Sequence, residues 1–463
     1  MEMSISAKDF VSELIDRAKV AQKEIENYTQ EQVDTLVKAI AWNIVKEENA
    51  VKVAELAVEE SELGNYDGKY GKLQKKVRGN LRDMLGAKTV GVIEEDEARG
   101  IIKIAKPVGV IGALVPCTNP EATPVIKAMN AIKGRNAIVF APHPRTKKTN
   151  TLIVDIMRET LKKFGAPEDL IIGIEEPSME ASSELMSQSD LVVATGGSGM
   201  VKAAYSSGTP AYGVGAGNAV VVVDETADLK DAAHKIMLSK TFDFATSCSS
   251  DNSIVVVESV YDELMKNLQG EGGYLTNASE KEMVQNALWV HGHLNREIIA
   301  QPAHKIADVA GVELPEGKSF IMVEETGVGA DHPFSGEKMS VVLTVYKVKD
   351  FNEAVDKVNE ITSYQGTGHS CGIHTNDDDR AVEYGIRTKT SRVMVRQPQC
   401  YGNSGNWDNG MPFTLTLGCG TWGGNIASEN VTYKHFINTT WVSKPIKEVV
   451  PSDEELFGDI MDK

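Results

Sequence analysis

The sequence predicts an α/β protein of two doubly wound domains, each with helices on both faces of a parallel sheet. Three observations support this. The chain has 463 residues, too many for one ordinary hydrophobic core. From Gly109 onward, short β-branched runs alternate with helical stretches, and a second alternating set begins after Cys248.

The first hundred residues predict amphipathic helices that cover the core. The stretches "AKDFVSELIDRAKVAQKEIENY" and "EQVDTLVKAIAWNIVKEE" repeat apolar residues at helical spacing. Their charged faces are typical of solvent-exposed surface, which favours a covering role over partner binding.

The strands of the first predicted sheet are the apolar runs "GVIGALVP", "AIVFAP", "DLIIGIEE", "DLVVATG" and "AVVVVD", with helical stretches between them. Continuous runs of Val, Ile and Leu are typical of parallel strands buried on both faces. Ligands of such sheets bind at the carboxyl ends of the strands, so we expect a site there.

The second alternating set runs from "SIVVVESVYDELMKNL" through "SFIMVEE", "MSVVLTVYKV" and "CGIHTN" to "SRVMVRQP". No internal repeat, low-complexity segment or Pro/Gly-rich linker separates the two sets. We therefore expect the domains to pack closely, with Cys248 near their junction.

Composition argues against several functional classes. A net charge of −18 and a pI near 5.1 disfavour nucleic acid and anionic membranes as partners. The sequence has no apolar run of about 18 residues and no signal-like N-terminus, so we expect a cytoplasmic protein. The five cysteines form an odd set without CxxC spacing, which predicts reduced thiols and no metal site.

Two glycine-rich segments are candidates for ligand contact. In "LVVATGGSGMVKAAY" a strand runs into Thr195, Gly196 and Gly197 before a helix, a context that suits a phosphate. The spacing is not GxGxxG, and a plain tight turn is the alternative. The second segment, "GVGAGNAVVVVD", precedes a strand, so it is either a ligand-approaching loop or a turn with a bulge.

Cys248 is the strongest candidate nucleophile. A lone cysteine is usually a small buried hydrophobe, and the other four keep that interpretation. Cys248 differs because polar residues flank it on both sides in "TFDFATSCSSDNS". A thiolate nucleophile also needs a hydrogen-bond donor for a developing oxyanion, and Asn119 in "PCTNP" is a candidate.

Motifs along essentially the whole chain resemble those of the aldehyde dehydrogenase superfamily, in particular its CoA-acylating branch. The segments that carry the resemblance are, in order, "VGVIGALVPCTNP", "IKGRNAIVFAPHPRTKK", "ATGGSGMVKAAYSSGTPAYGVGAGNAVVVVD", "TFDFATSCSSDNS", "GEKMSVVL", "GTGHSCGIHTND" and "LGCGTWGGNIASEN". The resemblance implies a nicotinamide cofactor domain over 1–93 and 108–240, a catalytic domain over 241–424, and an oligomerisation arm and tail over 94–107 and 425–463.

The resemblance also implies a reaction at Cys248. Its thiolate attacks the aldehyde to form a thiohemiacetal, hydride passes to the nicotinamide, and coenzyme A takes the acyl group from the resulting thioester. Asn119 and the backbone N–H of Cys248 form the oxyanion hole, and Glu337 contacts the cofactor ribose. The other residues expected at the cofactor are Thr118, Ala141, His143, Pro144, Arg145, Thr195, Gly196, Gly197, Val214, Gly215 and Met339.

One departure from the hydrolytic members of the superfamily predicts the second half of the reaction. Those members carry "ELGGK" where this sequence has "GVGAG", so Gly213 replaces the glutamate that activates water. Coenzyme A needs no such base, and its thioester product keeps the acyl group activated. The sequence therefore favours a reversible, CoA-acylating enzyme over a hydrolytic one or an inactive scaffold.

The cofactor preference is predicted from "APHPRTKK". Pro144 takes the place where NAD-preferring relatives often carry a glutamate, and Arg145, Lys147 and Lys148 follow. Cations beside the ribose favour a 2′-phosphate, so we expect NADP, with NAD as the alternative. A solvated basic helix start is the competing interpretation.

The substrate is expected to be a small anionic aldehyde. Arg392 and Arg396 lie on one face of the strand in "SRVMVRQPQC", where a guanidinium could bind a carboxylate or sulfonate. A structural ion pair at the domain seam is the alternative. Resemblance favours sulfoacetaldehyde, with succinate semialdehyde, acetaldehyde and propionaldehyde as alternatives.

Assembly is expected from family resemblance alone. "EARGIIKIAKP" and the tail "YKHFINTTWVSKPI" resemble segments through which relatives pair, so we expect a homodimer or homotetramer. Packaging in a bacterial microcompartment is left open.

Overall fold

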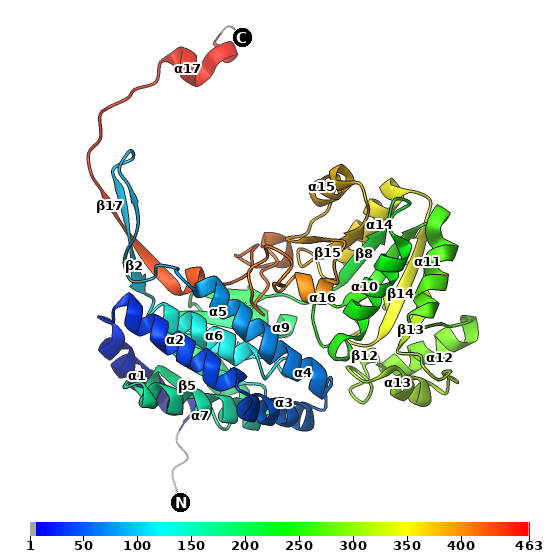
Figure 1. Cartoon of the computed structure of the whole chain (residues 1–463), viewed down its shortest axis with the longest axis horizontal. Helices are drawn as coiled ribbons and strands as arrows, with labels where there is room; N and C mark the ends of the chain where they lie inside the picture. Colours follow the sequence, from blue (N-terminus) through cyan, green and yellow to red (C-terminus); the bar gives the residue numbers. More distant parts are fainter. Residues whose placement is uncertain (1–5, 462) are drawn as a thin grey trace, which may run out of the picture.

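The computed structural model describes residues 6–461 and 463, and it has two α/β domains side by side with an antiparallel arm projecting from the first (Figure 1). Every strand pair in the two large sheets is parallel. The predicted fold class, two doubly wound α/β domains, is therefore confirmed.

The first domain contains a five-stranded sheet in the order β5-β4-β3-β6-β7. Helices α6 and α7 cover one face, and α8 covers the other, together with α1. The order reverses between β3 and β6, which makes the carboxyl ends of these two strands a topological switch point. The elements are β3 (Val110–Val115), α6 (Thr123–Lys133), β4 (Ala137–Pro142), α7 (Lys147–Lys163), β5 (Ile171–Gly173), α8 (Met179–Gln188), β6 (Leu191–Thr195), α9 (Ser198–Tyr205) and β7 (Ala211–Val214).

The predicted cover helices form before the first sheet begins. The side chain of Ser6 caps the first helix, and Thr29 with Gln32 forms a capping box on the second. Their apolar stripes join the core of the first domain. The helices are α1 (Ala7–Ile25), α2 (Gln30–Val45), α3 (Glu47–Ser61), α4 (Tyr66–Lys72) and α5 (Arg78–Met84), with a π-helical turn at Leu73–Val77 between the last two.

The second domain contains a seven-stranded sheet in the order β10-β13-β14-β9-β8-β15-β16. Alternate valines of β8 pack into two separate cores, Val221 and Val223 on one face and Val220 and Val222 on the other. The strands are β8 (Ala219–Val223), β9 (Asp251–Val257), β10 (Gly273–Leu275), β13 (Phe320–Glu324), β14 (Val342–Val348), β15 (Cys371–His374) and β16 (Val393–Val395). The helices are α10 (Leu229–Thr241), α11 (Glu258–Gly270), α12 (Ala278–Leu288), α13 (Ala303–Ala310), α14 (Phe351–Tyr364), α15 (Asp378–Arg387) and α16 (Gln399–Gly402), and a hairpin joins β11 (Trp289–Val290) to β12 (His293–Leu294).

The strand pairing corrects the predicted boundary between the two domains. We expected the first domain to extend to residue 240, but β8 and α10 belong to the second domain because β8 pairs with β9 and β15. The apolar run of β8 has the same character as the strands before it, so its pattern does not reveal which sheet it joins. The change of sheet falls between β7 and β8.

The arm is a three-stranded antiparallel sheet in the order β1-β2-β17. The C-terminal strand pairs along the whole of β2, from Ile437 opposite Pro107 to Ser443 opposite Ile101. Beyond it the tail runs away from the domain to a short helix (Figure 1). These elements are β1 (Gly91–Asp96), β2 (Ile101–Pro107), β17 (Ile437–Ser443) and α17 (Asp453–Phe457).

Neither a membrane span nor a metal cluster is found in the part of the chain that the structure describes. Its helices lack the combination of length and apolar character that crossing a bilayer requires. In that same part, no three His, Cys, Asp or Glu side chains gather as a metal site would require.

Candidate active site

A cavity of about 540 Å³ lies where the two large sheets meet. One wall comes from residues that follow β3, β4 and β6, at the carboxyl edge of the first sheet. The facing wall comes from residues that precede β8, β9 and β14, at the amino edge of the second sheet. The cavity thus combines a switch point that suits a dinucleotide with loops from another domain that can carry reactive groups.

The first wall fits the nicotinamide cofactor that the sequence predicts. Helix α9 begins beside the cavity, and its N-cap residue Gly197 supplies no side-chain hydrogen bond, so the first N–H groups remain available for a phosphate. The cavity also extends along the ends of β3 and β4, where an elongated dinucleotide would lie. The predicted cofactor residues that line it are Thr118, Ala141, His143, Pro144, Thr195, Gly196, Gly197, Val214, Gly215, Glu337 and Met339. Their roles in cofactor binding stay predictions.

Cys248 lies at the domain junction, on the loop that leads into β9, and it lines the cavity. The neighbouring loop before β8 passes directly against it. A Cβ atom added to Gly217 would lie 1.8 Å from the carbonyl oxygen of Cys248, which is far inside van der Waals contact. Only glycine therefore allows the two loops to approach this closely.

Substituting Gly217 by alanine is expected to displace Cys248. A displacement of about 1 Å at a reacting group can cost about 10²-fold, so we expect a loss of that order in kcat, measured as NAD(P)H formation. Gly270→Ala at the end of α11, outside the cavity lining, is the control. Its added Cβ would have no atom within 4 Å, so both kcat and thermal unfolding should stay unchanged. An unchanged kcat in Gly217→Ala would contradict this packing.

His369 is a functional candidate that the sequence analysis missed. Its Nε2 lies 3.2 Å from the Cys248 Sγ, and its Nδ1 lies 2.8 Å from the Ser370 Oγ. If Nδ1 carries the hydrogen and donates it to Ser370, the Nε2 lone pair faces the thiol and can accept its proton. The motif "GTGHSCG" could have pointed to His369. It precedes β15, and the amino end of β15 lies beside β8.

The Cys248–His369 pair is neutral before substrate binds. Burial raises the pKa of the Cys248 thiol to about 12, and Glu337 and Cys419 add to this effect. Burial, with the nearby Arg392 cation, lowers the pKa of His369 to about 3. The thiol therefore keeps its proton until something in the cavity favours the thiolate.

Asn119, the predicted oxyanion donor, shares the cavity with Cys248. It follows β3 and lines the same cavity. One N–H of its amide donates to the Thr118 Oγ1 at 3.2 Å, which leaves the other for a ligand. Across the cavity, burial raises the pKa of Glu337 to about 7.

Two of the three predicted 2′-phosphate cations are engaged with carboxylates. Arg145 pairs with Glu62 at 3.1 Å and lies outside the cavity lining, and Lys147 pairs with Glu176 at 2.6 Å. Both carboxylates are largely exposed. Such surface pairs contribute about 0–1 kcal/mol, so a phosphate dianion could replace them.

The prediction that Arg396 binds the substrate is wrong. It follows β16 at the carboxyl edge of the second sheet, whereas the cavity lies at the amino edge. Its guanidinium instead donates to the Thr375 carbonyl and the Asp378 carboxylate, a surface ion pair within the second domain and not at the domain seam.

Arg392 precedes β16 and so lies closer to the cavity, but its donors are occupied. It is buried and bonds to the carbonyls of His369 and Gly418 and to the Asn430 side chain. It therefore holds the His369 loop in place and acts on Cys248 only through its charge.

Gly213 supplies no base, and its position could not easily carry one. A Cβ there would meet Tyr205 and Val201 at 2.7 Å, away from the cavity. Among the described residues that line the cavity, Glu337 is the one carboxylate.

The fold and the site define a dinucleotide-dependent enzyme whose cavity between two domains contains a cysteine. The sequence matches the aldehyde dehydrogenase family over residues 1–287. The chain belongs to this family.

Relatives and solved structures agree with this assignment. The chain is 50% identical to a sulfoacetaldehyde dehydrogenase of Acholeplasma sp over 96% of this chain and 93% of the relative. It is 48% identical to the acylating sulfoacetaldehyde dehydrogenase of Bilophila wadsworthia over 98% and 99%. An acetylating aldehyde dehydrogenase from Geobacillus thermoglucosidasius superposes with a TM-score of 0.93 at 39% identity, covering 96% and 98%. A propionaldehyde dehydrogenase from Rhodopseudomonas palustris with bound propionyl-CoA superposes with a TM-score of 0.86 at 26% identity, covering 94% of each chain.

Proposed function

We propose that this protein is a CoA-acylating aldehyde dehydrogenase that converts sulfoacetaldehyde, NADP and coenzyme A to sulfoacetyl-CoA and NADPH, reversibly. The observation that carries the proposal is the contact between the Cys248 thiol and the buried His369, beside a cavity that Cys248 and Asn119 line together. The acylating relatives support the reaction type.

The first half-reaction follows from these three residues. His369 accepts the Cys248 proton as the sulfur attacks the aldehyde carbon, and the carbonyl oxygen becomes an oxyanion. The Asn119 N–H and the Cys248 backbone N–H stabilise that oxyanion. A nicotinamide held by the first wall of the cavity would supply the hydride acceptor for this step. As the thiohemiacetal collapses and gives up its hydride, the acyl group stays on Cys248 as a thioester.

The second half-reaction is proposed from the absence of a carboxylate at Gly213. With no carboxylate at Gly213, a water molecule has no general base in the position that hydrolytic members use. The coenzyme A thiolate attacks the acyl carbon without such help, and the Cys248 sulfur leaves as a thiolate that recovers its proton. The acyl group therefore moves from one thiol to another.

Sulfoacetaldehyde is proposed from the relatives and not from an ion pair in the cavity. The two relatives that carry the name share about half of their residues with this chain. The buried Arg392 charge behind His369 supplies a positive potential for a distal sulfonate.

The test compares aldehydes and coenzymes in one assay. Full-length protein receives sulfoacetaldehyde, succinate semialdehyde or acetaldehyde, with NADP or NAD, with and without coenzyme A. We expect at most one NADPH per active site without coenzyme A, sustained turnover with it, and the highest kcat/KM for sulfoacetaldehyde with NADP. Sustained turnover to free acid without coenzyme A would contradict the acylating reaction, and a tenfold preference for NAD would contradict NADP use.

We also propose that the arm of β1, β2 and β17 pairs with a second copy of the chain, giving a dimer or tetramer. The tail supports this because it exposes apolar side chains, among them Val449, Val450 and Ile460. Light scattering gives the molar mass in solution, and dividing it by the 50.2 kDa monomer mass gives the number of copies in the assembly. Packaging in a bacterial microcompartment is a further proposal, supported only by a related propionaldehyde dehydrogenase whose source is such a compartment.

A further inference from the structure

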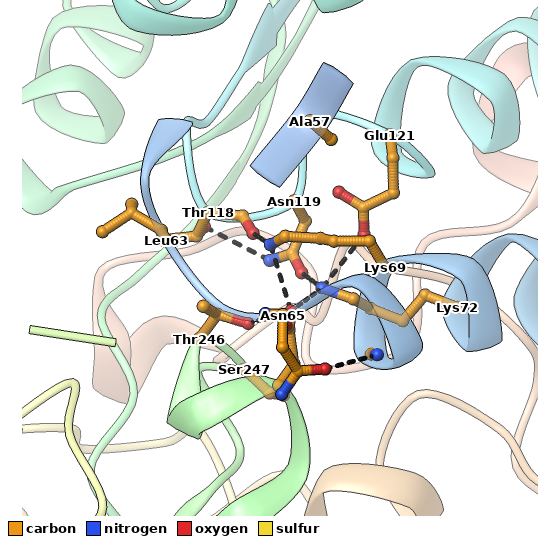
Figure 2. Close-up of polar contacts among 12 residues, drawn as sticks. Ala57, Leu63, Asn65, Lys69, Lys72, Thr118, Asn119, Glu121, Thr246 and Ser247 are labelled. Atoms are coloured by element: carbon orange, nitrogen blue, oxygen red, sulfur yellow. Dashed lines mark hydrogen bonds and ion pairs between the residues drawn. The ribbon is translucent and has the colours of Figure 1, made fainter. Parts of the chain in front are cut away.

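A cluster of buried charges lies directly behind Asn119. The ammonium of Lys72 lies 2.5 Å from the Asn119 Oδ1 and 3.0 Å from the Glu121 Oε1 (Figure 2). It also lies 2.6 Å from the Asp243 Oδ2. Lys72, Asp243 and Glu121 are each at most 3% exposed. Burying charges costs free energy even when they are paired, so such a cluster indicates a role besides stability.

The contact with Lys72 determines which way the Asn119 amide faces. An ammonium group only donates hydrogen bonds, so the amide must turn its oxygen toward Lys72 and its nitrogen away. The nitrogen then donates one N–H to Thr118 and keeps the second for the cavity. In the reversed orientation, the amide hydrogens would face the ammonium and the oxygen would face the oxyanion.

We propose that Lys72 is a positioning residue for the oxyanion hole, holding the Asn119 amide with an N–H directed at the oxygen of the Cys248 adduct. The inference rests on the proposed function, in which Asn119 binds that oxygen. The positive charge also polarises the amide, which makes its N–H a stronger donor.

The surroundings keep Lys72 charged. Burial alone would lower its pKa, but Asp243 and Glu121 outweigh burial and raise it. The ammonium is therefore present throughout the physiological pH range.

Asp243 connects this charge to the nucleophile loop. Its Oδ2 also accepts the Thr246 hydroxyl, and Thr246 precedes Cys248 by two residues and lines the cavity. One ammonium thus contacts both the oxyanion donor and the base of the loop that carries the nucleophile.

Glycines make room for the Asp243 side chain. A Cβ on Gly64 or Gly68 would lie 2.0 Å or 2.5 Å from its atoms, and the Asn65 N–H donates to its Oδ1 at 2.8 Å. The segment "GNYDGK" is thereby explained, since it surrounds the carboxylate that anchors Lys72.

A double-mutant cycle tests the inference. The variants are Lys72→Met, Asn119→Ala and both together, and the readout is the burst of NADPH formed from aldehyde without coenzyme A. We expect Asn119→Ala to slow the burst about 10²–10³-fold and Lys72→Met about 10²-fold. In the Asn119→Ala background, Lys72→Met should cost less than about threefold more, because the amide it positions is absent.

Two further variants separate positioning from folding. Lys76→Met is the matched control, because Lys76 is also buried and lies four residues along the chain, but it bonds only to the carbonyls of Tyr401 and Gly405. We expect it to retain the burst rate within about threefold, with thermal unfolding measured for every variant. Lys72→Gln keeps an N–H for Asn119 and should lose less than Lys72→Met. It replaces Lys72→Met in the cycle if the methionine variant does not fold.

The outcomes distinguish the inference from the proposed function. Losses that multiply in the double variant would overturn the positioning role while leaving the enzyme's activity established. A wild-type protein that forms no NADPH from any aldehyde would overturn the proposed function, and the inference with it.

Discussion

Replacing Cys248 by alanine is expected to abolish aldehyde oxidation, with kcat falling by a factor on the order of 10⁴ or more. The sulfur carries the acyl group between the two half-reactions, and alanine has no atom that can form the bond. In the wild-type protein, aldehyde and NADP without coenzyme A should leave an acyl adduct on the peptide that contains Cys248. Intact-protein mass spectrometry detects the protein with and without the acyl adduct, and peptide mass spectrometry locates the adduct.

The control for this prediction is Cys400→Ala. Cys400 is buried in the second domain, away from the cavity lining, so its variant should keep both activity and adduct. Full activity in Cys248→Ala, or an adduct on another cysteine such as Cys117, which also lines the cavity, would show that the nucleophile has been misassigned.

Replacing His369 by alanine is expected to slow adduct formation about 10²–10⁴-fold at neutral pH, because the thiol loses its proton acceptor. In the wild-type protein the lowered pKa of His369, about 3, keeps the imidazole neutral across the working range. The burst rate should therefore show no inflection near pH 6.5. It should rise toward alkaline pH, because the raised Cys248 pKa makes thiolate scarcer at lower pH.

The pH profile separates a proton acceptor from a structural histidine. In His369→Ala the deficit should shrink as pH rises, since hydroxide can then remove the thiol proton. His374→Ala is the matched control, because this buried histidine lies at the far end of β15 and does not line the cavity. A deficit that stays constant from pH 6 to pH 10 would contradict the assignment.

The site residues named from sequence were those carried by contiguous motifs. Cys248, Asn119 and the Thr195–Gly197 turn each belong to a short segment whose neighbours show its chemistry. The residues that were missed, His369 and Lys72, lie 121 and 176 positions from Cys248 in the numbering. Their proposed roles rest on contacts with Cys248 and Asn119 that are distant in sequence, which no local pattern contains.

The errors have the same origin. Arg392 and Arg396 were predicted on one face of a strand, but they flank β16, and only the packing of the second sheet determines that its amino edge meets the cavity. Likewise, β8 has the apolar run of a buried strand, and only its pairing with β9 and β15 assigns it to the second sheet.

The sequence by itself determined the α/β class, the alternation of strands and helices and the family resemblance, and it singled out Cys248 as the candidate nucleophile, because local periodicity and contiguous motifs carry this information. The tertiary structure alone decided which edges of the two sheets face each other, and it alone showed that His369 meets Cys248 within the second domain and that Lys72 meets Asn119 within the first. Hydrogen bonds and ion pairs act over about 3 Å, so partners far apart along the chain become known only when the folded domains bring them together.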